Sequence, residues 1–142
     1  GPTGAVRYWG LTQQEYYQKA DVWPFITHGE ILVVIMIEDS SGIAALSDIL
    51  QNVPGIGVVL IGEGDLSQEL GLPRQYEHPV VLEAMAEIVN ICQKNNVAVG
   101  HPHVNAQNVQ RLLEQGYTFL MAAPVRSTPG MDKGLEILGR KP

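Results

Sequence analysis

The stretch that decides the fold is Ile31-Leu-Val-Val-Ile-Met-Ile-Glu38-Asp39, together with its later counterpart Val58-Val-Leu-Ile-Gly-Glu-Gly-Asp65-Leu-Ser67. In both, a run of apolar, mostly β-branched residues ends in a carboxylate. This composition is typical of a strand covered on both faces, as in parallel sheets. Proteins of the α/β class place their chemistry at the carboxyl ends of such strands. If the two strands are parallel neighbours, Glu38 and Asp65 lie side by side at one rim.

The charge of these two acids needs to be balanced. No Lys or Arg adjoins Glu38 or Asp65 in the sequence. Neighbouring carboxylates repel each other unless a cation or a shared proton lies between them, and a hard divalent ion with oxygen ligands is the simplest such cation. The competing interpretation, ordinary strand-end or helix-capping acids, is favoured while the pattern stands alone.

Composition limits the class of protein. The chain has 142 residues, 45% of them apolar, which is enough to bury the core of one domain. A net charge of −6 and nine scattered basic residues argue against a nucleic-acid-binding surface. The single cysteine cannot form an intrachain disulfide, and no apolar run reaches the ~20 residues of a membrane span. We therefore expect a cytoplasmic protein with neither nucleic-acid nor membrane partners.

Strands and helices are expected to alternate after a leading segment. Gly1 to Gly10 lacks periodicity and is expected to be loop, and the capping box Thr12-Gln-Gln-Glu15 predicts a helix to about Ala20. Four strand–helix units follow. Their strands are expected at 31–37, 57–61, 97–100 and 117–123, and their helices at 43–51, 79–94, from 104 or 105 to 115, and at 131–138.

This alternation predicts an α/β fold with a parallel sheet and right-handed crossovers. The pattern alone does not separate an open doubly wound sheet from part of a barrel. No strand is followed by Gly-x-Gly-x-x-Gly, which counts against a dinucleotide-binding site.

A more specific signal lies in the order of short motifs. Met36-Ile-Glu38 at a strand end, Val53-Pro-Gly-Ile-Gly57, and Ile61-Gly-Glu-Gly-Asp65-Leu-Ser67 together resemble the HpcH/HpaI family of metal-dependent class II pyruvate aldolases, relatives of macrophomate synthase. Ala5-Val-Arg-Tyr-Trp-Gly10 is similar to the loop before the fifth strand in that family.

The resemblance implies a fold: a TIM (β/α)₈ barrel of the phosphoenolpyruvate/pyruvate superfamily type. Because such barrels need about 250 residues, this chain would supply only the C-terminal half, strands five to eight. Residues 1–142 would form one partial barrel domain, with a leading loop and short helix over 1–30 and four βα units over 31–142.

The resemblance also implies a function. Glu38 and Asp65 would bind Mg²⁺, Mn²⁺ or Co²⁺, and pyruvate or a longer 2-keto acid would complete the metal shell. Amides around Gly62, Glu63 and Gly64 would receive the substrate carboxylate. The implied activity is that of a carbon–carbon lyase, a class II aldolase working through a metal-stabilised pyruvate enolate. The alternatives are a citrate-lyase-like or malyl-type lyase of the same superfamily, or a non-catalytic half-barrel interaction domain.

Three departures from the family pattern matter. The usual Gly-Pro-Ala-Asp is Gly62-Glu-Gly-Asp65 here, and Met36 stands where many members have Gln. The family's base-side His and substrate-binding Arg lie in its early strands, so the catalytic residues are expected outside this chain. Since a half-barrel leaves two sheet edges exposed, we expect a homo-oligomer or pairing with a missing N-terminal half.

Other polar residues near the strand ends allow two interpretations. A solvated turn acid is favoured for Glu63 over a third metal ligand. His101 and His103 flank Pro102 after a strand, where imidazoles bind transition metals or shuttle a proton. Exposed imidazoles in a polar loop are the favoured interpretation of both.

The remaining candidates are assigned structural roles. His28 is expected at the surface of a turn, and His78 is expected to precede a helix-starting proline. Arg74 and Gln75 follow the second strand and lie where an acidic substrate would approach, although a solvated Arg is the simpler expectation. Cys92 falls on the apolar face of a helix and is expected in the core.

Overall fold

The structure is a computed structural model that describes residues 2–19, 22–23, 29, 31–121 and 129–140. Its helices are α1 (Pro2–Trp9), α2 (Gln13–Lys19), α3 (Ser40–Asn52), α4 (Glu63–Glu69), α5 (Pro79–Lys94), α6 (Val109–Glu114) and α7 (Pro129–Ile137). Its strands are β1 (Val22–Trp23), β2 (Ile31–Leu32), β3 (Val34–Ile37), β4 (Val58–Ile61), β5 (Ala98–His101) and β6 (Phe119–Leu120).

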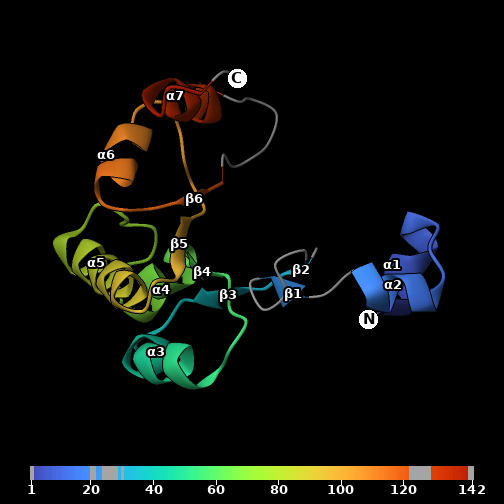
Figure 1. Ribbon diagram of the computed structural model, residues 1–142. Coiled ribbons are helices and arrows are strands. Elements are labelled where there is room, and N and C mark those ends of the chain that lie inside the picture. Colours follow the sequence, from blue (N-terminus) through green and yellow to red (C-terminus); the bar gives the residue numbers. More distant parts are fainter. Residues whose placement is uncertain (1, 20–21, 24–28, 30, 122–128, 141–142) are drawn as a thin grey trace.

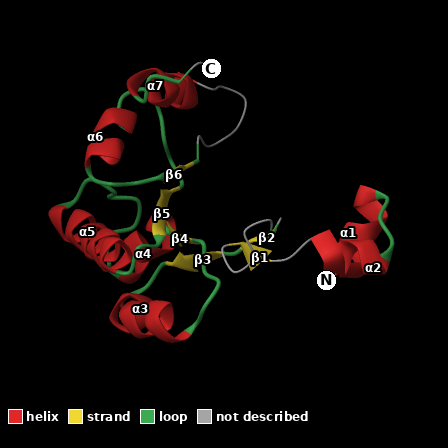
Figure 2. Ribbon diagram, viewed as in Figure 1, coloured by secondary structure: helices red, strands yellow, loops and turns green. Residues whose placement is uncertain are grey.

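The centre of the molecule is a parallel four-stranded sheet in the order β3-β4-β5-β6 (Figure 1). Each strand pairs with the next one along the chain, with Ile37 opposite Ile61 and Gly100 opposite both Leu60 and Phe119. Helices intervene between consecutive strands, and in Figure 2 α3, α5 and α6 lie on the same side of the sheet. The predicted parallel α/β arrangement is confirmed.

The face of the sheet that carries helices forms the core. Alternate residues of β3, β4 and β5 point toward this face and belong to one buried cluster with α3 and α5. Leu46 of α3, Ile88 of α5 and Ile61 of β4 are completely buried in it. Because β-strand side chains alternate between the two faces, the intervening residues define a second, inner face of the sheet.

The inner face is buried on β4 and open on β3. Val58 and Leu60 are buried, whereas their partners Val34 and Met36 are 40% and 52% exposed. Glycine at position 100 explains part of the difference: a Cβ there would lie 3.0 Å from carbons of both Leu60 and Phe119, so these two side chains close over the bare backbone. The expectation that residues 31–37 are covered on both faces is therefore wrong for β3, since β3 ends the sheet.

The capping box predicted at Thr12 is confirmed atom by atom. The Thr12 amide donates to the Glu15 carboxylate at 2.7 Å and the Glu15 amide to the Thr12 hydroxyl at 3.2 Å, which completes the capping box before α2. Asp39 accepts from the Gly42 amide at 2.6 Å and caps α3. Hydrogen bonds from Ser41 and then from Gly42 hold the pKa of Asp39 below its ordinary value.

The leading segment differs from expectation because Pro2–Trp9 is helical and not loop. Gly10 follows with φ +66° and the Leu11 amide donates to the Val6 carbonyl at 3.0 Å, which is a Schellman-type helix end. Proline at the start and glycine just past the end are the sequence signals of this helix. Helix α1 contacts α2, with the Trp9 and Tyr16 rings 6.0 Å apart.

Other strand and helix boundaries also differ from the predicted ones. The predicted strand 31–37 is divided at Val33 into β2 and β3, and β2 pairs in parallel with the unpredicted β1. Helix α6 begins at Val109, later than predicted, because Asn105 accepts from the amides of Gln107 and Asn108 and thereby forms a turn. The His28 turn and the end of the predicted strand 117–123 lie outside the described residues. No helix among the described residues is long and apolar enough to span a bilayer.

Core packing predicts the effect of one truncation. Leu46→Ala should lower the free energy of unfolding by about 2–5 kcal/mol, because the fully buried side chain leaves a cavity between α3 and the sheet. Leu138→Ala is the matched control: Leu138 is 53% exposed, so the same truncation should change stability by less than about 0.5 kcal/mol. Urea unfolding measures both, and equal losses would contradict the assignment of α3 to the core.

Candidate functional site

The two predicted metal ligands, Glu38 and Asp65, lie at the same end of the sheet. Glu38 follows β3 directly, and Asp65 is in the first turn of α4, which starts just after β4. Ile37 is paired with Ile61, and the Gly62 amide donates to the Ile37 carbonyl at 2.9 Å. Parallel pairing therefore brings both acids to the carboxyl-end rim.

Gly62 allows the Glu38 side chain to lie directly over the β4 backbone. A Cβ at position 62 would be 2.6 Å from the Glu38 Cβ and 2.8 Å from its Oε2, distances that no side chain tolerates. The same Cβ would be 3.1 Å from the Met36 sulfur, so Met36 and Glu38 share the inner face. The Glu38 carboxylate thus leans from β3 toward the strand that leads to Asp65.

The start of α4 adds polarity to this rim. Glu63 and Asp65 occupy the first turn, where the leading amides of a helix have no intrahelical acceptor. The turn expected at Glu63 is the beginning of this helix, because the Leu66 amide already donates to the Gly62 carbonyl at 2.9 Å. Glu38 is half-buried and Asp65 exposed, so both can exchange water for a ligand.

The donor set suits a hard ion with an incomplete protein shell. Among the described residues, no group of three His, Cys, Asp or Glu side chains is arranged to hold a metal. Mg²⁺ commonly keeps several waters and takes only one or two protein carboxylates, with substrate oxygens completing the shell. The pair Glu38 and Asp65 fits that mode of binding and not a closed structural site.

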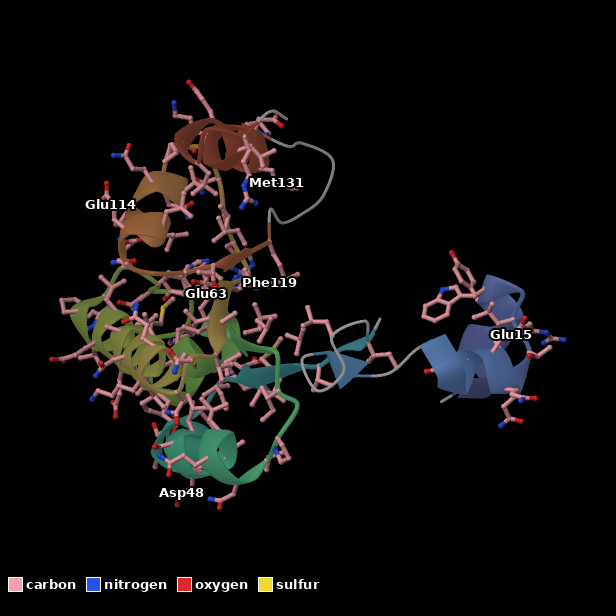
Figure 3. All side chains as sticks on the ribbon, viewed as in Figure 1. Glu15, Asp48, Glu63, Glu114, Phe119 and Met131 are labelled. Carbon is pink, nitrogen blue, oxygen red and sulfur yellow. The ribbon has the colours of Figure 1, made fainter. Side chains whose placement is uncertain are left out.

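Glu63 does not lie in the solvent. Its side chain is buried, and Figure 3 shows it in the interior, whereas Asp48 and Glu114 lie at the periphery. One carboxylate oxygen contacts Nδ1 of His103, and the other lies 3.4 Å from Nε2 of His101. The interpretation of Glu63 as a solvated turn acid is wrong, because these contacts come from a strand end some forty residues away that local sequence does not reveal.

His101 is also buried, so the expectation of an exposed imidazole is wrong for it and holds only for His103. The His103 amide donates to Nδ1 of His101 at 3.2 Å, so the neutral ring carries its proton on Nε2, toward Glu63. Burial, aided by the charge of His103, lowers the pKa of His101 to about 4. Tyr117 packs edge-on against the His101 ring at 5.2 Å.

Glu38 and Glu63 therefore face opposite sides of the sheet. Along β5, Val99 belongs to the helix-side core, Gly100 faces inward, and His101 returns to the helix side. Since Glu63 contacts His101, its carboxylate lies on the helix side, away from Glu38 and Met36. The predicted substrate-binding role of residue 63 thus concerns its backbone amide and not its side chain.

A pocket of about 870 Å³ opens on the helix side. Glu63, His101 and His103 line it together with residues of α5, α6 and the loop before α5. Glu38 and Asp65 are not among the described residues that line it. The pocket is therefore separate from the rim that carries the predicted metal ligands.

An ion pair spans part of this pocket. Arg111 of α6 donates two hydrogen bonds of 2.9 Å to the Glu77 carboxylate. The Arg111 hydrogen bond lowers the pKa of Glu77, and the same hydrogen bond raises that of Arg111. Arg74 and Gln75 also line the pocket, and both are exposed. They lie beside this pocket, whose lining the sequence interpretation did not anticipate.

The structural roles predicted for His78 and Cys92 are confirmed. His78 is the N-cap of α5 and accepts from the Val80 amide at 3.3 Å, ahead of Pro79. Cys92 is fully buried in the core, and burial raises the pKa of its thiol to about 12. A thiol protonated at neutral pH is no nucleophile.

Substitution of Gly62 tests the packing of Glu38. Gly62→Ala should lower the free energy of unfolding by about 1–3 kcal/mol, because the new methyl group overlaps Glu38 and Met36. Gly64→Ala is the control, since a Cβ there meets no atom within 4 Å. In a double-mutant cycle measured by urea unfolding, Glu38→Gly, which removes the Cβ that the new methyl group would meet, should restore part of the loss. Additive effects would contradict the contact.

The buried His101 predicts a dependence of stability on pH. Its pKa falls from 6.5 to about 4 on folding, so between these values the unfolded chain binds more protons. The free energy of unfolding should therefore be highest above pH 6.5, as far as it depends on His101, and should decline by up to about 3 kcal/mol as the pH falls toward 4. His101→Asn should make this decline smaller, and His78→Asn should not change it. Urea unfolding midpoints measured from pH 4 to pH 6.5 test this. If the midpoint of His101→Asn falls with pH as steeply as that of the unaltered chain, the assignment to His101 is contradicted.

Comparison with known proteins agrees with the fold and the order of motifs. Residues 4–124 match the HpcH/HpaI aldolase/citrate lyase family. The hydroxypyruvate/pyruvate aldolase of Paraburkholderia phytofirmans is 27% identical over 124 residues, covering 87% of this chain and 45% of that enzyme. A 4-hydroxy-2-oxo-heptane-1,7-dioate aldolase of Escherichia coli is 30% identical over 106 residues, covering 75% and 37%. The chain thus spans less than half the length of these relatives.

Solved structures give the same result. The HpcH/HpaI aldolase from Desulfitobacterium hafniense aligns with a TM-score of 0.61 at 26% identity, covering 80% of this chain and 44% of that one. Macrophomate synthase aligns with a TM-score of 0.58 at 25% identity, covering 68% and 34%. The predicted partial TIM-barrel fold is confirmed, with β3 to β6 as its consecutive strands. The chain belongs to the HpcH/HpaI aldolase/citrate lyase family.

Proposed function

We propose that this chain carries the metal-binding rim of an aldolase, a carbon–carbon lyase that cleaves or forms 2-keto acids. The observation that carries the proposal is the position of the Glu38 carboxylate over Gly62, at the end of the sheet that also bears Asp65. Two carboxylates at one rim of the sheet, with water and substrate oxygens completing the shell, match the way in which Mg²⁺ is commonly bound in proteins. The relatives named above as aldolases support the reaction class.

Each residue has a defined part in this proposal. Glu38 and Asp65 bind Mg²⁺, Mn²⁺ or Co²⁺. When bound, such an ion supplies Lewis-acid stabilisation for the negative charge that develops on the keto oxygen of the substrate. The Gly62 amide, predicted to bind the substrate carboxylate, already donates to the Ile37 carbonyl. The first-turn amides of Glu63 and Gly64 orient that carboxylate, because helix N-termini favour anions. Without a side chain, Gly62 leaves room for that close approach.

The substrate proposed is pyruvate or a longer 2-keto acid. Its keto oxygen would bind the metal ion, and its carboxylate would accept hydrogen bonds from the amides at the start of α4. The resemblance assigns the base-side His and the substrate-binding Arg to strands that precede this segment in the family. Both groups are needed for turnover, so we propose activity for a barrel completed by that half. Pairing between copies of this chain would cover the exposed sheet edges but would not supply either group.

Two alternatives have observations in their favour. The family description includes citrate lyases, and a citrate lyase from Burkholderia xenovorans shares the fold with a TM-score of 0.61 at 20% identity, which favours a citrate-lyase-like reaction at the same rim. The exposed inner-face residues Val34 and Met36 instead favour a half-barrel that binds another protein without catalysis. Assays with pyruvate as the aldol donor, with oxaloacetate and with acyl-CoA substrates distinguish the aldolase reaction from the citrate-lyase-like reaction.

Calorimetry with Mn²⁺ tests the rim directly. The unaltered chain should bind Mn²⁺, and pyruvate should bind only after the metal, because the ion holds the keto oxygen. Glu38→Ala and Asp65→Ala should each weaken Mn²⁺ binding by at least about tenfold, equivalent to about 1.4 kcal/mol of lost ligation.

The matched control is Asp48→Ala, an acid at the surface of α3 on the periphery of the molecule (Figure 3). It removes the same charge and should leave the Mn²⁺ affinity unchanged. If all three variants weaken binding equally, net charge and not the rim attracts the metal. If the unaltered chain does not bind Mn²⁺, the non-catalytic alternative replaces the aldolase proposal.

A further inference from the structure

The helix-side cluster of Glu63, His101 and His103 has the arrangement of a supported base. Glu63 is buried, His101 is buried beside it, and His103 is half exposed, with 52% of its side chain accessible. All three line the pocket of about 870 Å³. The proposed aldolase function uses none of these side chains.

The hydrogen bonds assign a role to each member of the cluster. Because Nδ1 of His103 faces the Glu63 carboxylate, that nitrogen carries a proton, and Nε2 is left for a ligand. A buried carboxylate that fixes the tautomer and orientation of an accessible imidazole is the relation between orienting acid and base in proton-transfer sites. His101 presents its Nε2 proton to the second oxygen of Glu63 at 3.4 Å, which limits the freedom of that carboxylate.

The pocket provides the rest of a small-molecule site. Its volume falls within the range of about 300–1,000 Å³ that ligand pockets occupy. Leu82, Met85 and Val89 of α5 form an apolar wall. Tyr76 stacks on the His103 ring with centroids 6.1 Å apart and 28° between the planes, so flat surfaces border the imidazole.

We propose that this pocket is a second binding site, for a planar aromatic molecule with an acidic hydroxyl group, a phenol, and that His103 accepts the hydroxyl proton. The ring lies against the apolar wall of α5. The proton moves from the phenol oxygen to Nε2 of His103, leaving a phenolate and an imidazolium, and the Glu63 carboxylate stabilises that imidazolium. Glu63 is a positioning residue, since it acts through His103.

The charges around the pocket favour the anion that forms. Arg74 lines the pocket and brings a guanidinium to it, while Glu77 is already bound to Arg111 through two hydrogen bonds. Glu63 is likewise occupied by the imidazoles. Once His103 has accepted the proton, its positive charge balances the negative charge of Glu63. Arg74 is then the positive charge left to face the ligand, which matches a phenolate better than an organic cation.

The experiment uses p-nitrophenol, whose phenolate is yellow and whose phenol is not. Added to the unaltered chain at a pH near its own pKa, the probe should show a saturable increase in phenolate absorbance, corresponding to a pKa of the bound probe lowered by about one unit. His103→Asn should abolish the increase. Glu63→Gln should reduce it while p-nitrophenol still binds, as followed by calorimetry, because a neutral amide orients the ring but does not stabilise imidazolium.

His78→Asn is the matched control, since His78 lines the same pocket but caps α5 and lies outside the cluster. It should keep the absorbance change. Glu38→Ala should keep it too, and His103→Asn should keep Mn²⁺ binding, so failure of this proposal and failure of the aldolase proposal are distinguishable. The proposal is overturned if p-nitrophenol does not bind, if it binds without phenolate formation, or if His103→Asn, folded by circular dichroism, behaves like the unaltered chain.

Discussion

The register of β3 against β4 is the constraint on which the rest of the structure depends. Pairing Ile37 with Ile61 brings Glu38 beside Gly62 and sets the start of α4 at the carboxyl-end rim. A shift of β3 by one residue would move Ile37 out of the core and turn Glu38 to the helix side. Burial of these apolar side chains therefore also fixes the geometry of the polar rim, with glycine at the one position where the two strands meet too closely for a side chain.

The same alternation separates two chemical environments within one short motif. Gly62 faces inward beneath Glu38, whereas Glu63 turns to the helix side and meets the imidazoles of β5 and its following loop. The inner rim is acidic and open to water, which suits a hydrated ion. The helix side is partly apolar and enclosed, which suits an organic ligand. Gly62 and Glu63, although adjacent in the sequence, therefore face two different surfaces, because the sheet separates the inner side from the helix side.

Features that depend on local sequence could be predicted, and features that depend on tertiary contact could not. The capping box at Thr12 and the α/β alternation are local and are confirmed. The helix Pro2–Trp9 was missed although proline and glycine mark its ends. The burial of Glu63 was missed because its partners lie far along the chain, although Val99 and His101, two residues apart on one strand, could have indicated that His101 faces the core.

Cys92 gives the protein an internal reporter of its own opening. The thiol is fully buried on α5 against the sheet, and burial keeps it protonated at neutral pH. Only an exposed thiolate attacks alkylating and disulfide reagents. The rate at which such a reagent modifies Cys92 therefore measures how often the helix layer separates from the sheet. A bound ligand that holds the helices against the sheet would slow this reaction, so its binding could be followed without attaching a probe to the protein.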